Sequence, residues 1–181
     1  CLGVERDYVI VKICLMGDSA VGKTSLIKRY VYDVFEDKYL ATIGSKVTKK
    51  EMDIEVEGRR IRTVMMLWDI LGQKKYFYSN VYFKGASGAI FVADLTKRET
   101  MDNFRFWYRS FVRVRGKEKP ILVLLNKADL VHEQAFDIEY ARGVLEDHGE
   151  FETIYTSAKT GEGVKEAFKA IADMIVRRIV P

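Results

Sequence analysis

An apolar run that leads straight into a glycine-bearing loop constrains this chain more than any other feature. Residues 9–16 are almost all apolar and include β-branched side chains, which is typical of a strand buried on both faces. The next eight residues, GDSAVGKT at 17–24, match the pattern G-x-x-x-x-G-K-[ST] without a substitution. Leu26, Ile27, Tyr30 and Val31 then recur at helical spacing. A strand, this loop and a helix in that order predict a binding site for nucleotide phosphates.

The chemistry of the loop assigns roles to its residues. Gly17 and Gly22 permit backbone conformations in which successive N–H groups point at phosphate oxygens. Lys23 brings a positive charge to the β and γ phosphates, and the Thr24 hydroxyl is suited to bind Mg²⁺. The residues here that we expect to contact the nucleotide are Ser19, Ala20, Val21, Gly22, Lys23, Thr24 and Ser25.

The rest of the chain alternates predicted strands and helices. Further strands are expected at 46–56, 59–68, 86–93, 121–125 and 152–156, and helices at 23–34, 75–83, 100–115, 136–148 and 162–179. This order predicts an α/β fold: a mostly parallel six-stranded sheet with one antiparallel edge strand and helices on both faces. The chain has no linker or repeat, so residues 1–181 are expected to form a single domain.

Three more motifs follow the ends of predicted strands, where ligands bind in such folds. Asp69 follows the strand 59–68 and offers a carboxylate that can hold Mg²⁺ through water, while Gly72 can bring its N–H close to a γ-phosphate. NKAD at 126–129 follows the strand 121–125, and Asp129 can accept hydrogen bonds from both N1 and N2 of guanine. Adenine has no such pair of donors, so the predicted base is guanine.

The last motif, after the strand 152–156, supplies a backbone N–H for the guanine oxygen O6. The residues expected to bind the base are Asn126, Lys127, Asp129, Ser157, Ala158 and Lys159.

Together, GDSAVGKT, Thr42, WDILGQ at 68–73, NKAD and TSAK at 156–159 resemble the small GTPases of the Ras superfamily, over residues 8 to 179. The segments 39–44 and 81–86 look most like the Rab branch. The resemblance implies that Phe35 packs against the guanine and that Tyr39 lies in the nucleotide site. It also implies that Thr42 closes on Mg²⁺ and the γ-phosphate and that Gln73 orients the attacking water. The implied catalytic residues are Gln73, Lys23 and Thr42, and the implied metal ligands are Thr24, Thr42 and, through water, Asp69.

The resemblance further implies a GTP-binding switch that hydrolyses GTP slowly. Segments 35–46 and 69–80 would be the two switches, where an exchange factor, a GTPase-activating protein and effectors bind. No arginine lies in 35–46 to assist in cis, so we expect a partner to accelerate hydrolysis.

Two departures from the family leave an alternative open. Ile70 and Leu71 replace the usual Thr-Ala and could bias the second switch or form an apolar partner surface. Lys74 stands where an acidic residue is usual, which brings the family's exchange route into question. The alternative is therefore a GTP-binding scaffold with little or no hydrolysis. A third interpretation, a small-substrate kinase, is disfavoured by NKAD.

The composition limits which ligands we expect the protein to bind and where in the cell we expect it to lie. The net charge is +4, and no aromatic residues interleave with the basic ones as they do in base-stacking proteins, so nucleic acid is not an expected ligand. No apolar run approaches the roughly 20 residues that span a bilayer. We expect a cytoplasmic monomer. The sequence lacks a C-terminal cysteine for prenylation, and attachment to a membrane surface stays open.

Overall fold

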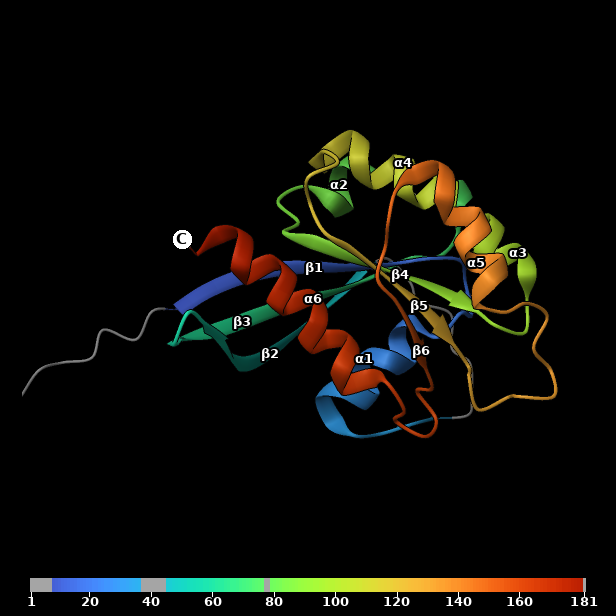
Figure 1. The fold of residues 1–181 in the computed structure, drawn as a ribbon, viewed down its shortest axis with the longest axis horizontal. Coiled ribbons are helices and arrows are strands. Elements are labelled where there is room, and N and C mark those ends of the chain that lie inside the picture. The colour runs from blue at the N-terminus through green and yellow to red at the C-terminus, as the bar shows by residue number, and fades with distance from the viewer. Residues whose placement is uncertain (1–7, 37–44, 77–78, 181) are drawn as a thin grey trace, which may run out of the picture.

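Strand β1 (Tyr8–Met16) lies inside a six-stranded sheet, with β3 on one side and β4 on the other (Figure 1). The computed structural model describes residues 8–36, 45–76 and 79–180. The sheet order is β2-β3-β1-β4-β5-β6, and β2 alone runs antiparallel to its neighbour. The other strands are β2 (Ser45–Val56), β3 (Arg59–Ile70), β4 (Gly88–Asp94), β5 (Ile121–Asn126) and β6 (Thr153–Thr156). The predicted α/β architecture is confirmed.

Helices cover both faces of this sheet. The helical segments are α1 (Lys23–Tyr32), the 3₁₀ turn η1 (Lys74–Tyr76), α2 (Ser79–Phe83), α3 (Arg98–Asp102), α4 (Phe104–Arg115), α5 (Ile138–Leu145), the 3₁₀ turn η2 (Glu146–His148) and α6 (Val164–Ile179). Helices α1 and α6 lie against one face, and α2, α3, α4 and α5 lie on the other (Figure 1). Within the described ranges, no helix combines the length and apolar character needed to cross a membrane.

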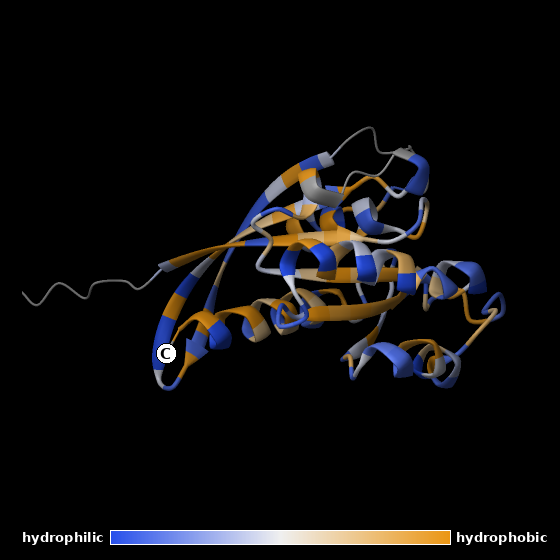
Figure 2. Cartoon of the chain, turned by 90° about the horizontal axis from the view of Figure 1, so that it is seen from above, coloured by the Kyte–Doolittle hydropathy of each residue, from blue (hydrophilic) through white to orange (hydrophobic). Residues whose placement is uncertain are grey.

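Each face has its own hydrophobic core. Val11, Ile13 and Leu15 of β1 pack towards α1 and α6, while Cys14 and Met16 pack towards α4. All five side chains are fully buried, because a central parallel strand is covered on both sides. The apolar residues accordingly line the middle of the molecule, and polar residues prevail at the hairpin and on the outer helix faces (Figure 2).

The helix predicted at 100–115 is instead two helices, and this is the main correction to the expected elements. α3 ends at Asp102 and α4 begins at Phe104, with Asn103 between them. The Asn103 side chain donates a hydrogen bond to Asp18 in the phosphate loop, 85 residues away in sequence. The helix predicted at 136–148 is also shorter, since the Asp137 carboxylate caps the N–H of Tyr140 and a 3₁₀ turn follows α5.

Candidate functional site

The carboxyl ends of the parallel strands meet at one edge of the sheet. The pairing places Leu15 of β1 opposite Asp69 of β3, and Asn126 of β5 opposite both Asp94 of β4 and Thr156 of β6. The motifs that follow these strands are therefore neighbours in space although they lie far apart in sequence.

Asn126 joins the base motif to the phosphate loop. It is 1% exposed, and its Nδ2 donates to the carbonyl of Val21 over 2.9 Å. Its Oδ1 accepts from the Thr156 hydroxyl over 3.0 Å. Gly22 has φ +104°, and a Cβ there would lie 2.3 Å from the Asn126 Nδ2, so only glycine fits between the two motifs.

Lys23 is a buried cation that faces the interior of the loop. Its Nζ donates to the carbonyls of Gly17 and Asp18 over 2.8 and 2.7 Å. Burial lowers the pKa of Lys23 to about 8, although Asp69 and Asp18 favour its charged form. A buried ammonium that depends on carbonyl oxygens is well suited to receive the oxygens of a phosphate.

Thr24 and Asp69 form a polar pair suited to a hard cation. The Thr24 hydroxyl donates to Asp69 Oδ2, and Asp69 is only 3% exposed. Burial raises the pKa of Asp69, opposed by the Thr24 hydrogen bond and by Lys23 and Lys46. The other oxygen, Oδ1, is buried and finds no hydrogen-bond partner among the residues that the structure describes. A hydroxyl, a carboxylate and an orphaned buried oxygen fit Mg²⁺, which prefers oxygen ligands.

Gly72 brings the end of β3 against the phosphate loop. A Cβ at Gly72 would lie 2.4 Å from the backbone nitrogen of Ser19, so this close approach requires glycine. Gln73 follows it and is exposed. The structure thus brings Gly72 next to the loop and leaves the Gln73 side chain at the surface.

The motifs predicted to bind the base form a connected group. Ser157 donates from its hydroxyl to Asp129 Oδ1 over 2.6 Å, and Ala158 is buried beside it. Lys127 has φ +67° and forms an ion pair of 2.7 Å with Asp94. These contacts tie Asp129 to Ser157, the residue before Ala158, and Lys127 to the end of β4.

Some sequence-predicted residues lie elsewhere. Tyr39 and Thr42 are outside the described residues. Phe35 is partly buried and packs against the core under α1 and α6. Ile70 is fully buried in the core under α4, which corrects the idea that it belongs to an apolar partner surface. Lys74 places its Nζ 5.4 Å from the ring centre of Phe106.

Sequence reasoning missed a second support of the phosphate loop. The Asp18 carboxylate accepts hydrogen bonds from Asn103 Nδ2 over 2.5 Å and from Trp107 Nε1 over 3.0 Å. Asp18 is one of the variable positions in the loop pattern, and no local signal marks either partner. Asp94 was also missed, although it directly follows the predicted strand 86–93 and the strand-end rule could have found it.

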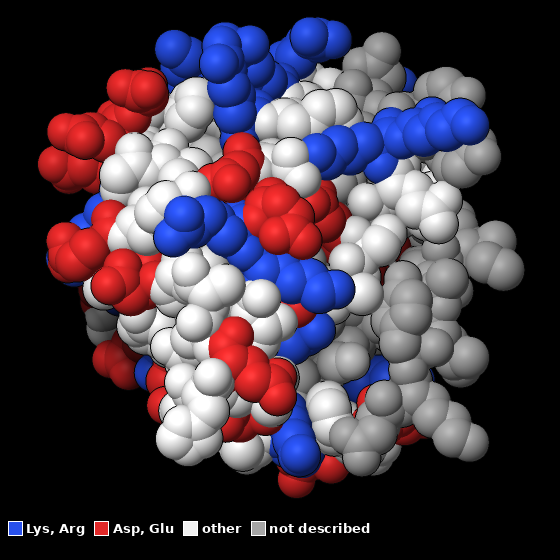
Figure 3. Space-filling model, turned by 90° about the vertical axis from the view of Figure 1, so that its right-hand side faces the viewer, with Lys and Arg blue, Asp and Glu red and all other residues white. Residues whose placement is uncertain are grey.

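The surface at this end of the molecule carries mixed charge. Seen end-on, lysine and arginine side chains alternate with acidic ones and with neutral residues (Figure 3). The described surface on this side therefore carries no field of a single sign.

Known proteins resemble the chain over most of its length. The model of the Ras family matches residues 12–177. The GTP-binding nuclear protein GSP1 of Encephalitozoon cuniculi is 37% identical over 97% of this chain and 80% of its own length. The Ras-related protein RABD1 of Arabidopsis thaliana is 34% identical, over 97% of this chain and 83% of its own. The Ras-related protein Rab-21 of Geodia cydonium is 33% identical, over 98% of this chain and 76% of its own length.

These matches agree with a sheet that brings a phosphate loop, a Thr–Asp pair with a buried carboxylate and an NKAD motif to one edge. The chain belongs to the Ras family, as a Rab-like small GTPase that binds and hydrolyses GTP.

Proposed function

We propose that this GTPase works as a molecular switch whose nucleotide lies between the phosphate loop and the NKAD and TSAK segments. The contact of Asn126 with Val21 is the observation that carries the assignment, because it joins the segment for the phosphates to the segment for the base. Asp129 would accept from guanine N1 and N2, and the Ala158 N–H would donate to O6. Phe35 and Tyr39 would complete the base and ribose side, and residues 1–181 would act as one domain.

We also propose Mg²⁺ as the cofactor. Thr24 would bind it directly and Asp69 through water, with Thr42 as a further ligand in the GTP state. In the described ranges no group of three His, Cys, Asp or Glu residues converges on one point, so phosphate oxygens and water would supply the remaining ligands. When bound, the ion neutralises negative charge that develops on the phosphates.

Hydrolysis would proceed by in-line attack of water on the γ-phosphorus. The new P–O bond forms as the bond to the β–γ bridging oxygen breaks, which gives GDP and inorganic phosphate. Gln73 would orient the water, and Lys23 would stabilise charge on the β and γ oxygens. The exposed position of Gln73 suits a residue that a partner or the bound nucleotide must bring into place. Intrinsic hydrolysis should be slow, and a GTPase-activating partner should raise its rate by about 10³–10⁵-fold.

Regulators and effectors would act at segments 35–46 and 69–80, which are the two switches that the family resemblance implies. We propose that the protein is a monomer located in the cytoplasm, or attached peripherally to a membrane. We propose no nucleic-acid ligand.

The test is single-turnover hydrolysis of GTP with saturating Mg²⁺, for wild type and Gln73→Leu. Slow hydrolysis in the wild type that slows further in the variant would support the switch with Gln73 as the water-orienting residue. Bound GTP that persists equally in both proteins would instead point to the scaffold with little hydrolysis.

A further inference from the structure

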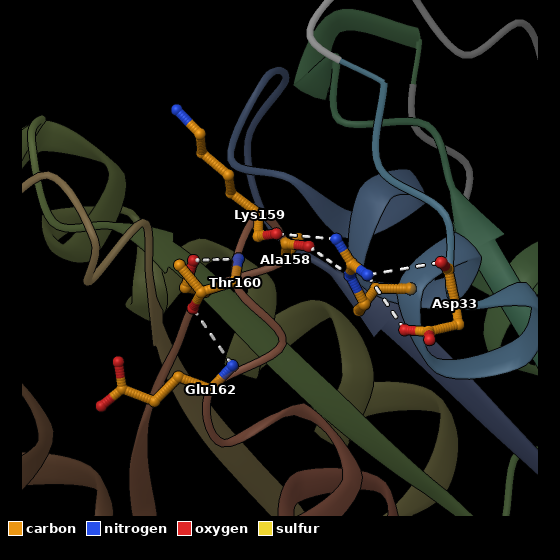
Figure 4. A network of polar contacts seen from close by, with 7 residues as sticks. Asp33, Ala158, Lys159, Thr160 and Glu162 are labelled. Atoms are coloured by element: carbon orange, nitrogen blue, oxygen red, sulfur yellow. Dashed lines mark hydrogen bonds and ion pairs between the residues drawn. The ribbon is translucent and has the colours of Figure 1, made fainter.

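Arg29, near the end of helix α1, reaches across to the segment expected to bind the base. Its Nε donates to the carbonyl of Ala158 over 2.8 Å, and its Nη2 donates to the carbonyl of Lys159 over 2.6 Å. Its Nη1 donates to the carbonyl and the carboxylate of Asp33 over 3.3 and 2.9 Å. Figure 4 shows Asp33 on one side of this network and Ala158 and Lys159 on the other.

These bonds fix consecutive peptide groups of the segment. The Ser157 carbonyl accepts from the N–H of Gly161 over 2.8 Å, and the next two carbonyls, of Ala158 and Lys159, accept from Arg29. The Thr160 N–H, in the same peptide group as the Lys159 carbonyl, donates to the Ser157 hydroxyl over 3.1 Å. Arg29 therefore holds two of three successive peptide groups, immediately after the N–H of Ala158 that would contact guanine O6.

The ion pair with Asp33 contributes less than the bonds to the carbonyls. The Asp33 side chain is 85% exposed, and exposed pairs contribute little because water screens them. The Arg29 side chain is only 19% exposed. A guanidinium offers donors in a fixed fork and can serve two adjacent carbonyls and a carboxylate at once, whereas a lysine ammonium acts as a single point charge.

Helix α1 links this contact to the phosphate end of the site. Lys23 and Thr24 lie in its first turn and Arg29 six residues later, about 9 Å along the axis. A helix of this length moves as a rigid unit, so Arg29 ties the base segment to the element that begins at the phosphates. We propose that Arg29 is a positioning residue that holds residues 157–159 in their base-binding conformation and thereby slows release of guanine nucleotide. This inference rests on the proposed function.

The test is the release rate of fluorescently labelled GDP from wild type, Arg29→Met, Arg29→Lys and Asp33→Asn. Loss of two hydrogen bonds to carbonyls should make release from Arg29→Met about tenfold faster. Arg29→Lys, which can restore one of the bonds, should fall between Met and the wild type. Asp33→Asn removes only the exposed ion pair and should stay within about twofold of the wild type.

A repeat in EDTA separates positioning of the base segment from a general loosening of the site. Chelation weakens the phosphate end directly, whereas Arg29 bonds to the base segment, so release from Arg29→Met should stay faster than release from the wild type in EDTA as well as with Mg²⁺. If Arg29→Met fails to fold, Arg29→Gln, which keeps one donor without the charge, takes its place.

A release rate within twofold of the wild type for both Arg29→Met and Arg29→Lys would overturn the inference. So would a factor that vanishes in EDTA, because Arg29 would then act through the phosphates. A wild-type protein that fails to hold labelled GDP at all would contradict the proposed function itself, and that outcome is visible before any variant is compared.

Discussion

At the scale of single residues, Asn126 lies where the phosphate and base halves of the site meet. Replacement by alanine leaves the Val21 carbonyl and the Thr156 hydroxyl without their buried partner. We expect Asn126→Ala to lower the free energy of unfolding of the nucleotide-free protein by about 1–3 kcal/mol and to weaken GDP binding. Urea unfolding and titration with labelled GDP measure the two effects. Asn126→Asp is the matched variant, since it keeps the acceptor for Thr156 but loses the donor to Val21. Unchanged values in both variants would contradict the bridging role.

Asp129 is the residue proposed to determine the identity of the base in the same site. A carboxylate accepts two N–H bonds, whereas an asparagine amide offers one acceptor and one donor. Asp129→Asn should therefore lower affinity for GDP by about 10–100-fold and favour xanthosine diphosphate, whose carbonyl oxygen at C2 can accept a hydrogen bond from the new amide donor. Ser157 can still donate to the amide oxygen, so the local fold should persist. Competition between the two nucleotides gives the ratio, and a ratio equal to that of the wild type would rule out Asp129 as the base-reading residue.

The roles of residues inside motifs could be predicted because each follows from the chemistry of a side chain and its place at a strand end. The contacts that hold those motifs could not. Arg29 and Asp18 meet their partners at separations of 129 and 85 residues, and nothing local in the sequence marks these partners. Only the folded arrangement of α1, α4 and the loop after β6 brings them together.

At the scale of elements, the break between α3 and α4 is an instance of tertiary structure overriding local pattern. The apolar spacing over residues 100–115 suits one continuous helix, yet Asn103 turns towards the phosphate loop and the helix divides there. The strands were predicted to within about two residues, because buried apolar runs mark most of them directly and polar–apolar alternation marks β2. Helix ends were less well predicted, since they depend on caps such as Asp137.

This break makes α4 a support for the phosphate loop, and a nearly isosteric change tests it. Asn103→Asp places a second carboxylate against Asp18, and the repulsion should displace the loop. We expect weaker GDP binding, by about tenfold, with a smaller effect for Asn103→Ala, which removes the donor without adding charge. Calorimetric titration with GDP compares the two variants. Equal effects would mean that the lost hydrogen bond, and not the charge, is what matters.

His148 in η2 gives the packing of this element a pH dependence. Its ring lies 4.9 Å from that of Tyr108 and 5.6 Å from that of Phe104. Burial lowers its pKa below the ordinary value of about 6.5; Arg105 and Arg109 act in the same direction and Asp147 opposes them. The folded protein therefore disfavours the charged imidazole, and its stability should fall as pH drops from about 6.5 through the lowered pKa.

Unfolding by urea at a series of pH values, for wild type and His148→Gln, isolates this contribution. The difference in unfolding free energy between the two should change across that window and stay constant above it. His132→Gln is the matched control, because that histidine is exposed. A constant difference at all pH values would show that the pKa of His148 does not change on folding.

At the scale of the whole molecule, parallel strands deliver the site. Strands β3, β4, β5 and β6 all run in the same direction as β1. Their carboxyl ends therefore share one edge, and short motifs far apart in sequence become neighbours there. This is why the site could be anticipated from strand ends alone. It also means that the segments proposed to bind the phosphates and the base lie far apart in the chain, so the ligand should stabilise the entire fold.

Thermal unfolding of the nucleotide-free protein tests this linkage. A ligand at about 1,000 times its Kd stabilises the folded state by about 4 kcal/mol, which for a chain of this size raises Tm by roughly 8–16 °C. GDP with Mg²⁺ should produce this rise. ADP at the same concentration should produce far less, because adenine has no donor pair for Asp129 and leaves that carboxylate unpaired. Equal shifts with the two nucleotides would mean that the phosphates alone account for binding and that the base segment, though folded next to the loop, contributes no selectivity.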